Sequence, residues 1–367
     1  MFGRILVKGI ILIVNVIAVF VLLFTPVAAK INPQIITFPA YFTLVFPFVV
    51  ILNIGFVLFW VFARKWQFLL SLIALIFISS DISIIFPIQF EKKQVITTEK
   101  TIKVLSYNTM LSALLVKHTR NKPNPILEYI INEDADVVCL QEFAVSPDEK
   151  FLTYEDVSKA LIKQYPYSQV TFKSKNEWSE VGLATFSKFP IVNKGTVHFD
   201  SNYNLCHFCD IDVDDQLIRL VNVHLESNRL TSGEKAMPIE LKNNFNAEKL
   251  SGTTLYLSRK LGLAYRIRST QADSVSALID NTSTKVILCG DFNDIPLSYA
   301  YTKVRGHLKD AFVESGSGFG WTFNESLYNF RIDYIMYSED FSSTSFAIAK
   351  LKGSDHYPII SQINITH

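Results

Sequence analysis

Hydrophobic residues are concentrated in the first 90 positions, and the pattern changes sharply after them. Three long apolar runs cover residues 10–29, 38–62 and 68–88, with very few charges among them. Each run is close to the ~20 residues that a helix needs to cross the hydrocarbon core of a bilayer. Buried helices of a soluble protein are the alternative, but three such runs in succession argue against it. We therefore predict a transmembrane region with about three helices over residues 1–90.

The rest of the chain alternates between short apolar runs, which are typical of strands, and stretches with helical periodicity. Residues 91–101 are polar and predict a linker, and residues 228–256 predict a long loop. A block of this length can bury one sizeable core, so the mixture indicates an α+β or α/β domain over residues 102–367. Strands are predicted over residues 102–108, 136–142, 181–187, 210–213, 217–227, 285–292, 331–338 and 357–365, and helices over 125–132, 154–164 and 257–279.

Charge separates the two parts of the chain as clearly as hydrophobicity does. Five basic residues and one acidic residue give residues 1–90 a net charge of +4, and because the whole chain carries +1, residues 91–367 carry −3. A slightly acidic block lacks the basic footprint of a protein that binds nucleic acid non-specifically. A local basic groove stays compatible with this balance.

The basic residues of the first block predict its orientation in the membrane. Arg4 and Lys8 precede the first run and Arg64 and Lys65 join the second to the third, so both places would be cytoplasmic. The domain after residue 100 would then lie on the extracytoplasmic side, although four lysines between residues 92 and 103 weaken this signal. Small residues at 26–29 also resemble a cleavage site, which leaves a signal peptide as the alternative for the first run.

The four cysteines do not fix the redox compartment. Cys139 and Cys289 lie within predicted strands and are interpreted as core residues. Cys206 and Cys209 form a C-x-x-C pair, for which a disulfide and two unlinked strand residues are both open.

Two polar strings, GDFND and SDH, mark candidate chemistry near the ends of apolar runs. GDFND contains Asp291 and Asn293, which point the same way in an extended chain and can face one reacting group. SDH contains Asp355, a hard oxygen ligand, and His356, a titratable imidazole. These residue types fit hydrolysis assisted by a divalent cation. Either string alone would be interpreted as an ordinary polar loop.

Seven strings in a fixed order carry a resemblance to a known family. They are KVLSYNT, VVCLQE, VGLATFSKFPI, VNVHLES, CGDFNDIP, RIDYI and SDHYP, and they fall within residues 102–361. In this order they resemble the endonuclease/exonuclease/phosphatase superfamily, which includes deoxyribonucleases, sphingomyelinases and inositol polyphosphate phosphatases. The resemblance implies an α+β fold, a four-layer α/β/β/α sandwich in which helices flank two packed mixed β-sheets, with the site at one edge of the sheets.

The resemblance also implies a site for Mg²⁺ or Mn²⁺. Glu142 ends a buried strand, where an unpaired carboxylate is costly, so a cation is a natural partner. By resemblance Glu142 is the principal metal ligand, Asn108 lies near the metal and the phosphate, and Asp355 completes the oxygen-rich cluster. We therefore predict Asn108, Glu142 and Asp355 as the metal residues.

By the same resemblance, five further residues act on the phosphate ester. Asp291 orients and deprotonates the attacking water, and Asn293 holds a phosphate oxygen. His356 contacts the scissile phosphate, with Asp333 fixing its tautomer and favouring the imidazolium. His224 lies near the leaving group as a donor or general acid.

The predicted activity is metal-dependent hydrolysis of a phosphodiester or phosphomonoester by an activated water, and the substrate class stays open. The alternatives are an endonuclease on the extracytoplasmic side that acts on DNA or RNA and a sphingomyelinase-like or phospholipase C-like lipid hydrolase, and the substrate would be nucleic acid, a lipid head group or a small phosphate ester. Membrane tethering brings lipid head groups close, and the net charge of −3 gives no special support to long-range capture of DNA. A non-catalytic membrane-anchored binding module is a further alternative, but it gives no reason for the matched residues. The bilayer is an expected partner, and no protein partner is inferred. Residues 321–323 are open between a substrate wall and apolar core.

Overall fold

The chain folds into two compact units. One contains Met1–Ile85, Ser227–Thr270 and Ile295–Thr302, and the other contains Phe86–Glu226, Gln271–Asp294 and Lys303–His367. We call them the helical unit and the sandwich unit. The predicted linker at 91–101 lies outside the described residues except for positions 100 and 101. The structure, a computed structural model, describes residues 2–89, 100–111, 115–231, 233, 234, 237, 247–325 and 328–365.

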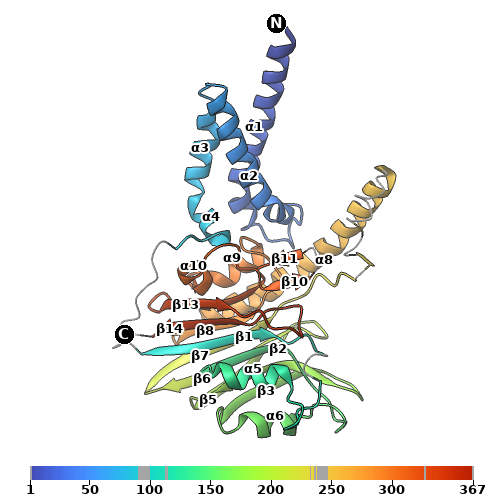
Figure 1. The fold of residues 1–367 in the computed structure, drawn as a ribbon, viewed down its shortest axis with the longest axis vertical. Coiled ribbons are helices and arrows are strands. Elements are labelled where there is room, and N and C mark those ends of the chain that lie inside the picture. The colour runs from blue at the N-terminus through green and yellow to red at the C-terminus, as the bar shows by residue number, and fades with distance from the viewer. Residues whose placement is uncertain are drawn as a thin grey trace. The chain divides into compact units, whose positions relative to one another are not determined.

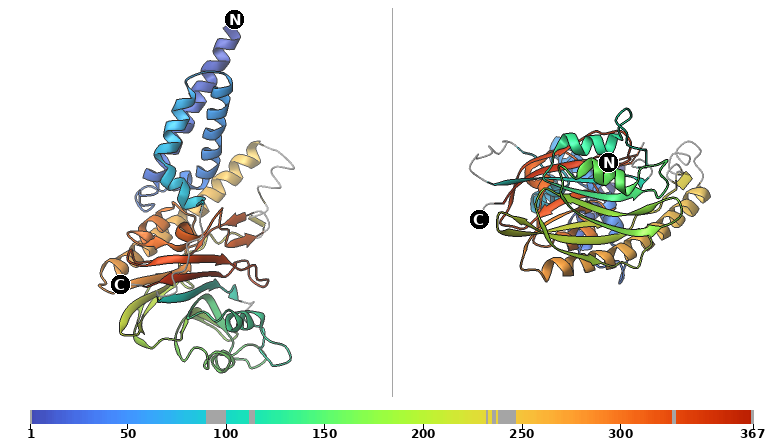
Figure 2. Two further views of the ribbon diagram at one scale, coloured as in Figure 1. Left: turned by 60° about the vertical axis from the view of Figure 1, so that its left-hand side comes forward. Right: turned by 90° about the horizontal axis from the view of Figure 1, so that it is seen from below.

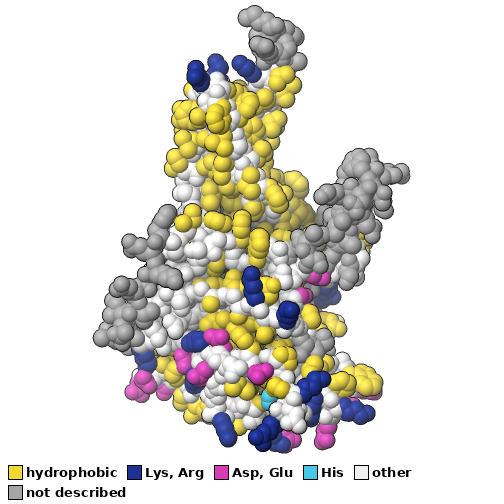
Figure 3. Space-filling view, in the orientation of Figure 1, with side chains coloured by type: hydrophobic (Ala, Val, Ile, Leu, Met, Phe, Trp, Pro, Cys, Tyr) yellow, Lys and Arg dark blue, Asp and Glu magenta, His cyan; other side chains and the backbone are white. Residues whose placement is uncertain are grey.

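The helical unit contains two helices that could span a membrane, or three if a bent pair counts as one span. In α1 the candidate span is Val7–Ala28 and in α2 it is Ala40–Phe62, while α3 and α4 meet at a bend of 66°. Figure 3 shows hydrophobic side chains over the visible face of these helices, with Lys and Arg side chains at the end where α2 leads into α3. The helices, blue in Figure 1, are α1 (Phe2–Ala28), α2 (Ala40–Phe62), α3 (Phe68–Phe77) and α4 (Ser79–Ile85).

A buried polar cluster joins α1, α2 and α3. Asn15 donates from Nδ2 to Ser71 Oγ at 2.6 Å, and Ser71 donates to Asn53 Oδ1 at 2.8 Å. Trp60 donates from Nε1 to Asn15 Oδ1 at 3.0 Å. All four side chains are buried. Hydrogen bonds between helices in an apolar environment fix their relative position, so α1 is a structural partner of α2 and α3.

The sandwich unit contains two six-stranded sheets packed face to face (Figures 1 and 2). Among the described strands, β1–β2 and β7–β8 are parallel pairs and the other neighbours are antiparallel. The first sheet has the order β13 (Ser342–Ile348), β14 (Ile359–Asn364), β1 (Thr101–Asn108), β2 (Val137–Val145), β4 (Glu180–Ser187) and β3 (Tyr167–Lys175). The second has the order β5 (Ile191–Val197), β6 (Leu205–Val213), β7 (Gln216–His224), β8 (Lys285–Asp291), β12 (Asp333–Tyr337) and β9 (Lys309–Asp310).

Helices cover the outer faces of both sheets, so the sandwich has the four layers that the sequence predicted. In the right-hand view of Figure 2, α5 and α6 lie outside the first sheet, and the end of α8 lies outside the second. A short hairpin, β10 (Phe323–Glu325) and β11 (Tyr328–Phe330), stands apart from the two sheets. The helices are α5 (Pro125–Glu133), α6 (Tyr154–Leu161), α8 (Ala247–Asp280), α9 (Tyr299–Arg305) and α10 (Ala311–Ser315).

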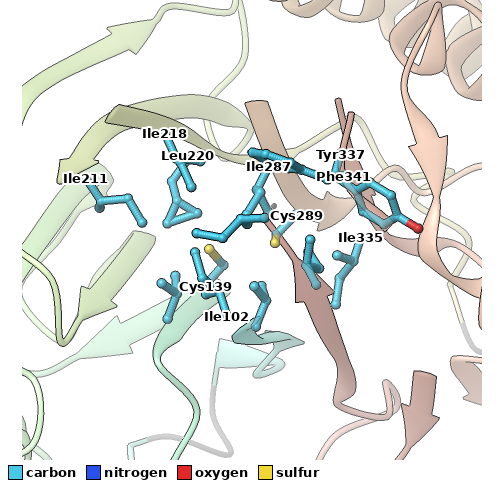
Figure 4. Close-up of a cluster of buried hydrophobic side chains, with 14 of the residues drawn as sticks. Ile102, Cys139, Ile211, Ile218, Leu220, Ile287, Cys289, Ile335, Tyr337 and Phe341 are labelled. Carbon is cyan, nitrogen blue, oxygen red and sulfur yellow. The ribbon is translucent and has the colours of Figure 1, made fainter. Parts of the chain in front are cut away.

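The main hydrophobic core lies between the two sheets. Figure 4 shows side chains from both of them, including Ile102 and Cys139 from the first sheet and Ile287 and Ile335 from the second, all without solvent exposure. A second core lies on the other face of the first sheet, where Leu105 belongs to the same cluster as residues of α5 and α6. Strands β1 and β2 are therefore buried on both faces, which explains their nearly continuous apolar sequences.

The helices on the first sheet begin at residues that suit helix starts. The Asn124 side chain accepts hydrogen bonds from the backbone amides of Ile126 and Leu127, and Pro125 occupies the first turn. Thr153 and Asp156 exchange side-chain and backbone bonds in a capping box at the start of α6. Local sequence and tertiary packing thus agree at both helices.

The structure departs from the predicted elements mainly at sheet edges and in one long helix. Strands β3, β5 and β13 were not predicted, and each lies at the edge of a sheet, where partial exposure removes the continuous apolar signal. The predicted loop at 228–256 is wrong over its last part, because α8 begins at Ala247. All four cysteines are free and buried, so the structure contains Cys206 and Cys209 as unlinked strand residues.

Candidate active site

Strand ends from both sheets supply polar side chains at one edge of the sandwich unit. Because β1–β2 and β7–β8 are parallel pairs, the carboxyl ends of each pair lie side by side. The register of the second sheet places His224 of β7 beside Asp291 of β8, and Asp291 beside Asp333 of β12. Three predicted site residues are therefore neighbours in adjacent strands. Asn108, the last residue of β1, joins them by the hydrogen bonds described below.

Glu142 occupies an irregular position in β2. The pairing of β2 with β4 shifts register between Leu140 and Phe143, and Glu142 has a φ of 50°. This left-handed conformation is uncommon for glutamate and turns the side chain out of the regular alternation of the strand. The Glu142 side chain keeps 27% of its surface exposed, whereas that of Asp291 keeps 1%. Glu142 is thus the more accessible of these two carboxylates.

Asn108 connects the two carboxylates. Its Nδ2 donates to Asp291 Oδ2 at 2.8 Å and to Glu142 Oε1 at 3.4 Å. Its Oδ1 accepts a hydrogen bond from the Met110 amide at 3.0 Å. The amide nitrogen of Asn108, and not its oxygen, therefore faces the carboxylates.

Asn293 donates a hydrogen bond to the other carboxylate oxygen of Asp291. Its backbone, with a φ of 51°, places its N–H 2.7 Å from Asp291 Oδ1. Its Nδ2 donates to the Leu225 carbonyl at 3.0 Å and lies 3.1 Å from His224 Nε2. Both carboxylate oxygens of Asp291 consequently have hydrogen-bond donors from neighbouring asparagines.

His356 is held in place by Asp333. Its Nδ1 lies 2.9 Å from Asp333 Oδ2, and its Nε2 points to Asp291 Oδ2 at 3.6 Å. Burial alone would lower the pKa of His356, but the charges of Asp333 and Asp291 outweigh it and raise the pKa to about 10. His356 is therefore an imidazolium at neutral pH.

His224 lies close to the same Asp291 oxygen but has the opposite electrostatic character. Its Nε2 is 3.7 Å from Asp291 Oδ2 and 3.8 Å from Glu142 Oε1. Burial lowers the pKa of His224, and the Asp291 charge only partly opposes this. Burial also raises the pKa of Asp291 to about 6, although the charge of His356 works against the shift. The site thus combines a neutral imidazole, an imidazolium and a weakly acidic carboxyl group.

Asp355 contributes a negative charge to the site. Its backbone carbonyl accepts a hydrogen bond from the Asn324 amide at 2.8 Å, and its side chain is half-buried. Burial is the main cause that raises the pKa of Glu142, and the negative charges of Asp355 and Asp333 raise it further. The predicted metal carboxylates, Glu142 and Asp355, therefore repel one another, which a bound cation would relieve.

Two groups of residues offer ligands to a metal. Among the described residues, ligand atoms of Asp291, Asp333 and His356 all lie within 4.8 Å of one another. This group is poorly suited to a metal, because His356 is protonated and donates to Asp333. Glu142 and Asp355 instead provide half-buried carboxylate oxygens, the ligand type that Mg²⁺ and Mn²⁺ prefer. The residues present fit a hard cation beside Glu142.

Two hydroxyl groups support the site without having been predicted as site residues. Ser354 Oγ donates to the Asn108 carbonyl at 2.8 Å and accepts from the His356 amide at 3.0 Å. Thr322 Oγ1 accepts from the Asp333 amide at 3.2 Å and is fully buried. Ser354 could have been found from its place in the SDH string, whereas burial of Thr322 leaves no signal in the sequence.

For residues 321–323 the sequence left two interpretations, a substrate wall and apolar core. The structure contains both kinds of residue in this segment. The ring of Phe323 lies 5.1 Å from the His356 ring, and Thr322 is buried. Trp321 keeps 47% of its surface exposed and stacks on Phe319 at 5.4 Å. An aromatic surface is thus available beside the residues that hold His356.

This fold, with such a site at one edge of its two sheets, is typical of hydrolases that act on phosphate esters. The model of the Endonuclease/Exonuclease/phosphatase family matches residues 105–356, and the chain belongs to this family. Members of the family are metal-dependent phosphoesterases, including nucleases and phosphatases, and generally use divalent metals such as Mg²⁺. The resemblance inferred from the sequence is therefore confirmed.

Solved structures share the fold at low sequence identity. An endonuclease/exonuclease/phosphatase from Beutenbergia cavernae is 16% identical, with 72% of each chain covered and a TM-score of 0.50. The human Nocturnin catalytic domain is 19% identical, with 74% of this chain and 98% of that chain covered and a TM-score of 0.51. A second family model, a domain of unknown function (DUF8431), matches residues 8–83. No curated protein matches the chain.

Proposed function

We propose that the chain is a membrane-anchored, divalent-metal-dependent phosphoesterase that hydrolyses a phosphodiester or phosphomonoester by in-line attack of water. The observation that carries the proposal is the placement of Asp291 between a neutral His224 and a charged His356. A base, a neutral donor and a fixed positive charge around one position are groups that can catalyse the hydrolysis of a phosphate ester.

Glu142 and Asp355 are the proposed metal ligands, with Asn108 beside them. When bound, the cation supplies electrostatic stabilisation to the charged phosphate oxygens. In the structure the Asn108 side-chain nitrogen donates hydrogen bonds to Glu142 and Asp291, which supports a role in orienting both carboxylates. The accessible side chain of Glu142 supports its role as the principal ligand.

Asp291 is the proposed general base. Its pKa of about 6 keeps it ionised at neutral pH while leaving it basic enough to accept a proton from water. Hydrogen bonds from Asn293 and Asn108 fix its two oxygens, so the attacking water would meet a carboxylate of defined orientation. This preorganisation removes the need to reorient the base during the reaction.

His356 and His224 have different proposed roles at the phosphate. His356, charged because of Asp333, is the proposed contact to the anionic phosphate oxygens. His224 is the proposed donor near the leaving group. In the structure Asn293 Nδ2 donates to His224 Nε2 at 3.1 Å, and with substrate bound Asn293 would instead hold a phosphate oxygen. Removal of either histidine would then affect a different part of the reaction.

Hydrolysis of bis(p-nitrophenyl) phosphate by the purified full-length protein tests the activity. We expect turnover with Mg²⁺ or Mn²⁺, its loss with EDTA, and a decrease of about 10²–10⁴-fold in Asp291→Asn. Asp215→Asn, in the exposed turn between β6 and β7, is the matched control and should keep full activity. Absence of turnover with both metals, or equal turnover in wild type and Asp291→Asn, would refute the proposal.

A membrane-held phosphate ester is the favoured substrate class. The candidate spans of the helical unit would keep the enzyme at a bilayer, and the net charge of −3 over residues 91–367 gives no support to long-range capture of nucleic acid. A panel of sphingomyelin, phosphatidylinositol phosphates, plasmid DNA, RNA and sugar phosphates tests this. Cleavage of DNA or RNA without lipid turnover would assign a nuclease instead.

We also propose a multi-pass topology with the sandwich unit on the extracytoplasmic side. Lys8, Arg64 and Lys65 would lie on the cytoplasmic side, in line with the excess of basic residues in cytoplasmic loops. Alkaline phosphatase fused after residue 100 should then be active. An inactive fusion that is nevertheless expressed at normal level would reverse the orientation.

A further inference from the structure

The connection between α1 and α2 is bonded to the part of α8 that belongs to the helical unit. Gln34 donates from Nε2 to the Arg266 carbonyl at 2.8 Å, and Arg266 donates from Nε to Thr37 Oγ1 at 2.8 Å. Tyr41 donates from its hydroxyl to the Ser258 carbonyl at 2.5 Å. These contacts all lie within the helical unit, and they join two parts of the chain that are more than 200 residues apart.

A glycine allows this close approach. A Cβ atom at Gly262 would lie 2.9 Å from the Tyr41 hydroxyl and 3.2 Å from Thr37 Cγ2. Both neighbours are held by hydrogen bonds, Tyr41 to Ser258 and Thr37 to Arg266. Contact between α8 and the connection therefore depends on the absence of a side chain at position 262.

These contacts set the depth of α8 relative to a bilayer. The candidate spans are Val7–Ala28 and Ala40–Phe62, so residues 29–39 between them would lie at the membrane surface. Tyr41 belongs to the first turn of the second span and bonds to Ser258. The part of α8 around residues 258–266 would then lie at the level of the lipid headgroups.

At this level α8 presents an exposed stripe of apolar and basic side chains. Leu255, Arg259, Leu263 and Arg266 are all exposed and are spaced by three or four residues, which places them on one side of a helix. Leu263 keeps 61% of its surface exposed. Residues 251–270 contain basic residues and no acidic ones, which complements an anionic phosphate surface.

The connection adds exposed apolar side chains next to this stripe. Ile35, Ile36 and Phe38 keep 80%, 54% and 67% of their surfaces exposed. Exposed apolar side chains beside basic ones are typical of segments that lie in a membrane interface, where aliphatic groups enter the acyl region and charged groups reach the phosphates. The same bilayer that the spans cross would cover both segments.

We propose that residues 251–266 form an interfacial helix in the headgroup layer of this bilayer, with Leu255 and Leu263 among the acyl chains and Arg259 and Arg266 at lipid phosphates. The proposal rests on membrane insertion of α1 and α2, which is part of the proposed function. The bilayer would thereby also hold part of the chain that follows β7, the strand that ends at His224.

Site-specific fluorescence in lipid vesicles tests the interfacial helix. The full-length protein carries a single introduced cysteine, Leu255→Cys or Leu263→Cys, labelled with an environment-sensitive dye. The four native cysteines are buried and would remain unlabelled in the folded protein. Vesicles of phosphatidylcholine and phosphatidylglycerol contain a lipid quencher with its nitroxide near the start of the acyl chain. Ala277→Cys, exposed on the same helix but in the sandwich unit, is the matched control, and Phe48→Cys in α2 reports insertion of the span.

We expect quenching at Leu255→Cys and Leu263→Cys to exceed that at Ala277→Cys by at least about threefold, as for a helix buried ~5–10 Å into the interface. A quenched Phe48→Cys with Leu263→Cys no more quenched than Ala277→Cys would overturn the interfacial helix and leave the membrane anchor intact. An unquenched Phe48→Cys would overturn insertion of the span and the interfacial helix together.

Discussion

Replacement of Asp333 by asparagine removes the charge that sustains the His356 imidazolium while keeping the size of the side chain. In the wild type, Asp333 and Asp291 overcome the effect of burial and hold the pKa of His356 at about 10. Asp333 is the larger of these two favourable causes and bonds directly to the ring at 2.9 Å. In Asp333→Asn, only the charges of Asp291 and Asp355 would oppose the effect of burial, and the pKa of His356 would fall toward its ordinary value of 6.5.

The expected loss of activity follows from the protonated fraction of His356. At pH 8 this fraction would fall from about 0.99 to about 0.03, so protonation alone predicts a decrease of about 30-fold. At pH 6 His356 would be mostly protonated in both the wild type and Asp333→Asn, so protonation alone would lower the activity by less than about twofold. Any loss of ring orientation would add a factor that does not depend on pH.

The measurement is the pH profile of kcat/KM for bis(p-nitrophenyl) phosphate between about pH 5.5 and 9. We expect the ratio of wild type to Asp333→Asn to rise steeply above pH 6.5, while Asp215→Asn follows the wild type throughout. An equal ratio at pH 6 and pH 8 would refute the assignment of His356 as a catalytic imidazolium. Thermal unfolding of Asp333→Asn, in the detergent solution used for the activity assay, shows whether the variant is folded.

Three further predictions concern other parts of the chain. Glu142→Gln should raise the Mg²⁺ concentration for half-maximal activity by about 10–100-fold, and the exposed Glu149→Gln should leave it unchanged in the same titration. His207 is buried between Thr171 and Thr185, and burial lowers its pKa to about 3. Its contribution to stability is therefore complete above pH 6.5 and is lost as the pH falls toward 3, about 2 kcal/mol of it by pH 5. Guanidinium unfolding of His207→Gln should show no such loss, and an equal pH dependence in both proteins would contradict this. Because Asn15 bonds to Ser71 and Trp60, α1 should remain attached in the mature protein; an intact mass beginning after Ala29 would show that it is cleaved.

The fold was predictable where burial leaves a periodic apolar signal. Strands buried on both faces, such as β1, β2 and β8, appear as nearly continuous apolar runs, and the order of motifs indicated the sandwich. Edge strands such as β3 have one exposed side and mixed sequences, so local patterns could not define them. The start of α8 was missed because residues 247–256 are largely polar and carry little helical periodicity.

Residue types and motif order indicated the candidate site, but its distances came only from tertiary structure. No sequence pattern shows that Asn108 aims its nitrogen at Asp291 across 183 positions of chain. The opposite pKa shifts of His224 and His356 depend on which carboxylates surround each ring, and those carboxylates come from different strands. The contact between α8 and the connection that joins α1 to α2 is equally non-local, and no sequence pattern indicated it.

Glu142 and Asn293 have φ angles of 50° and 51°, which glycine would adopt more easily. Such a conformation costs a glutamate about 1–2 kcal/mol, whereas asparagine adopts it at a lower cost. A variant library selected only for heat resistance would therefore accumulate glycine at position 142, and by the proposed function it would lose hydrolysis at the same time. A library selected for turnover would keep the strained glutamate and asparagine. If Glu142 binds the metal as proposed, position 142 is a place where a residue needed for activity lowers the stability of the fold.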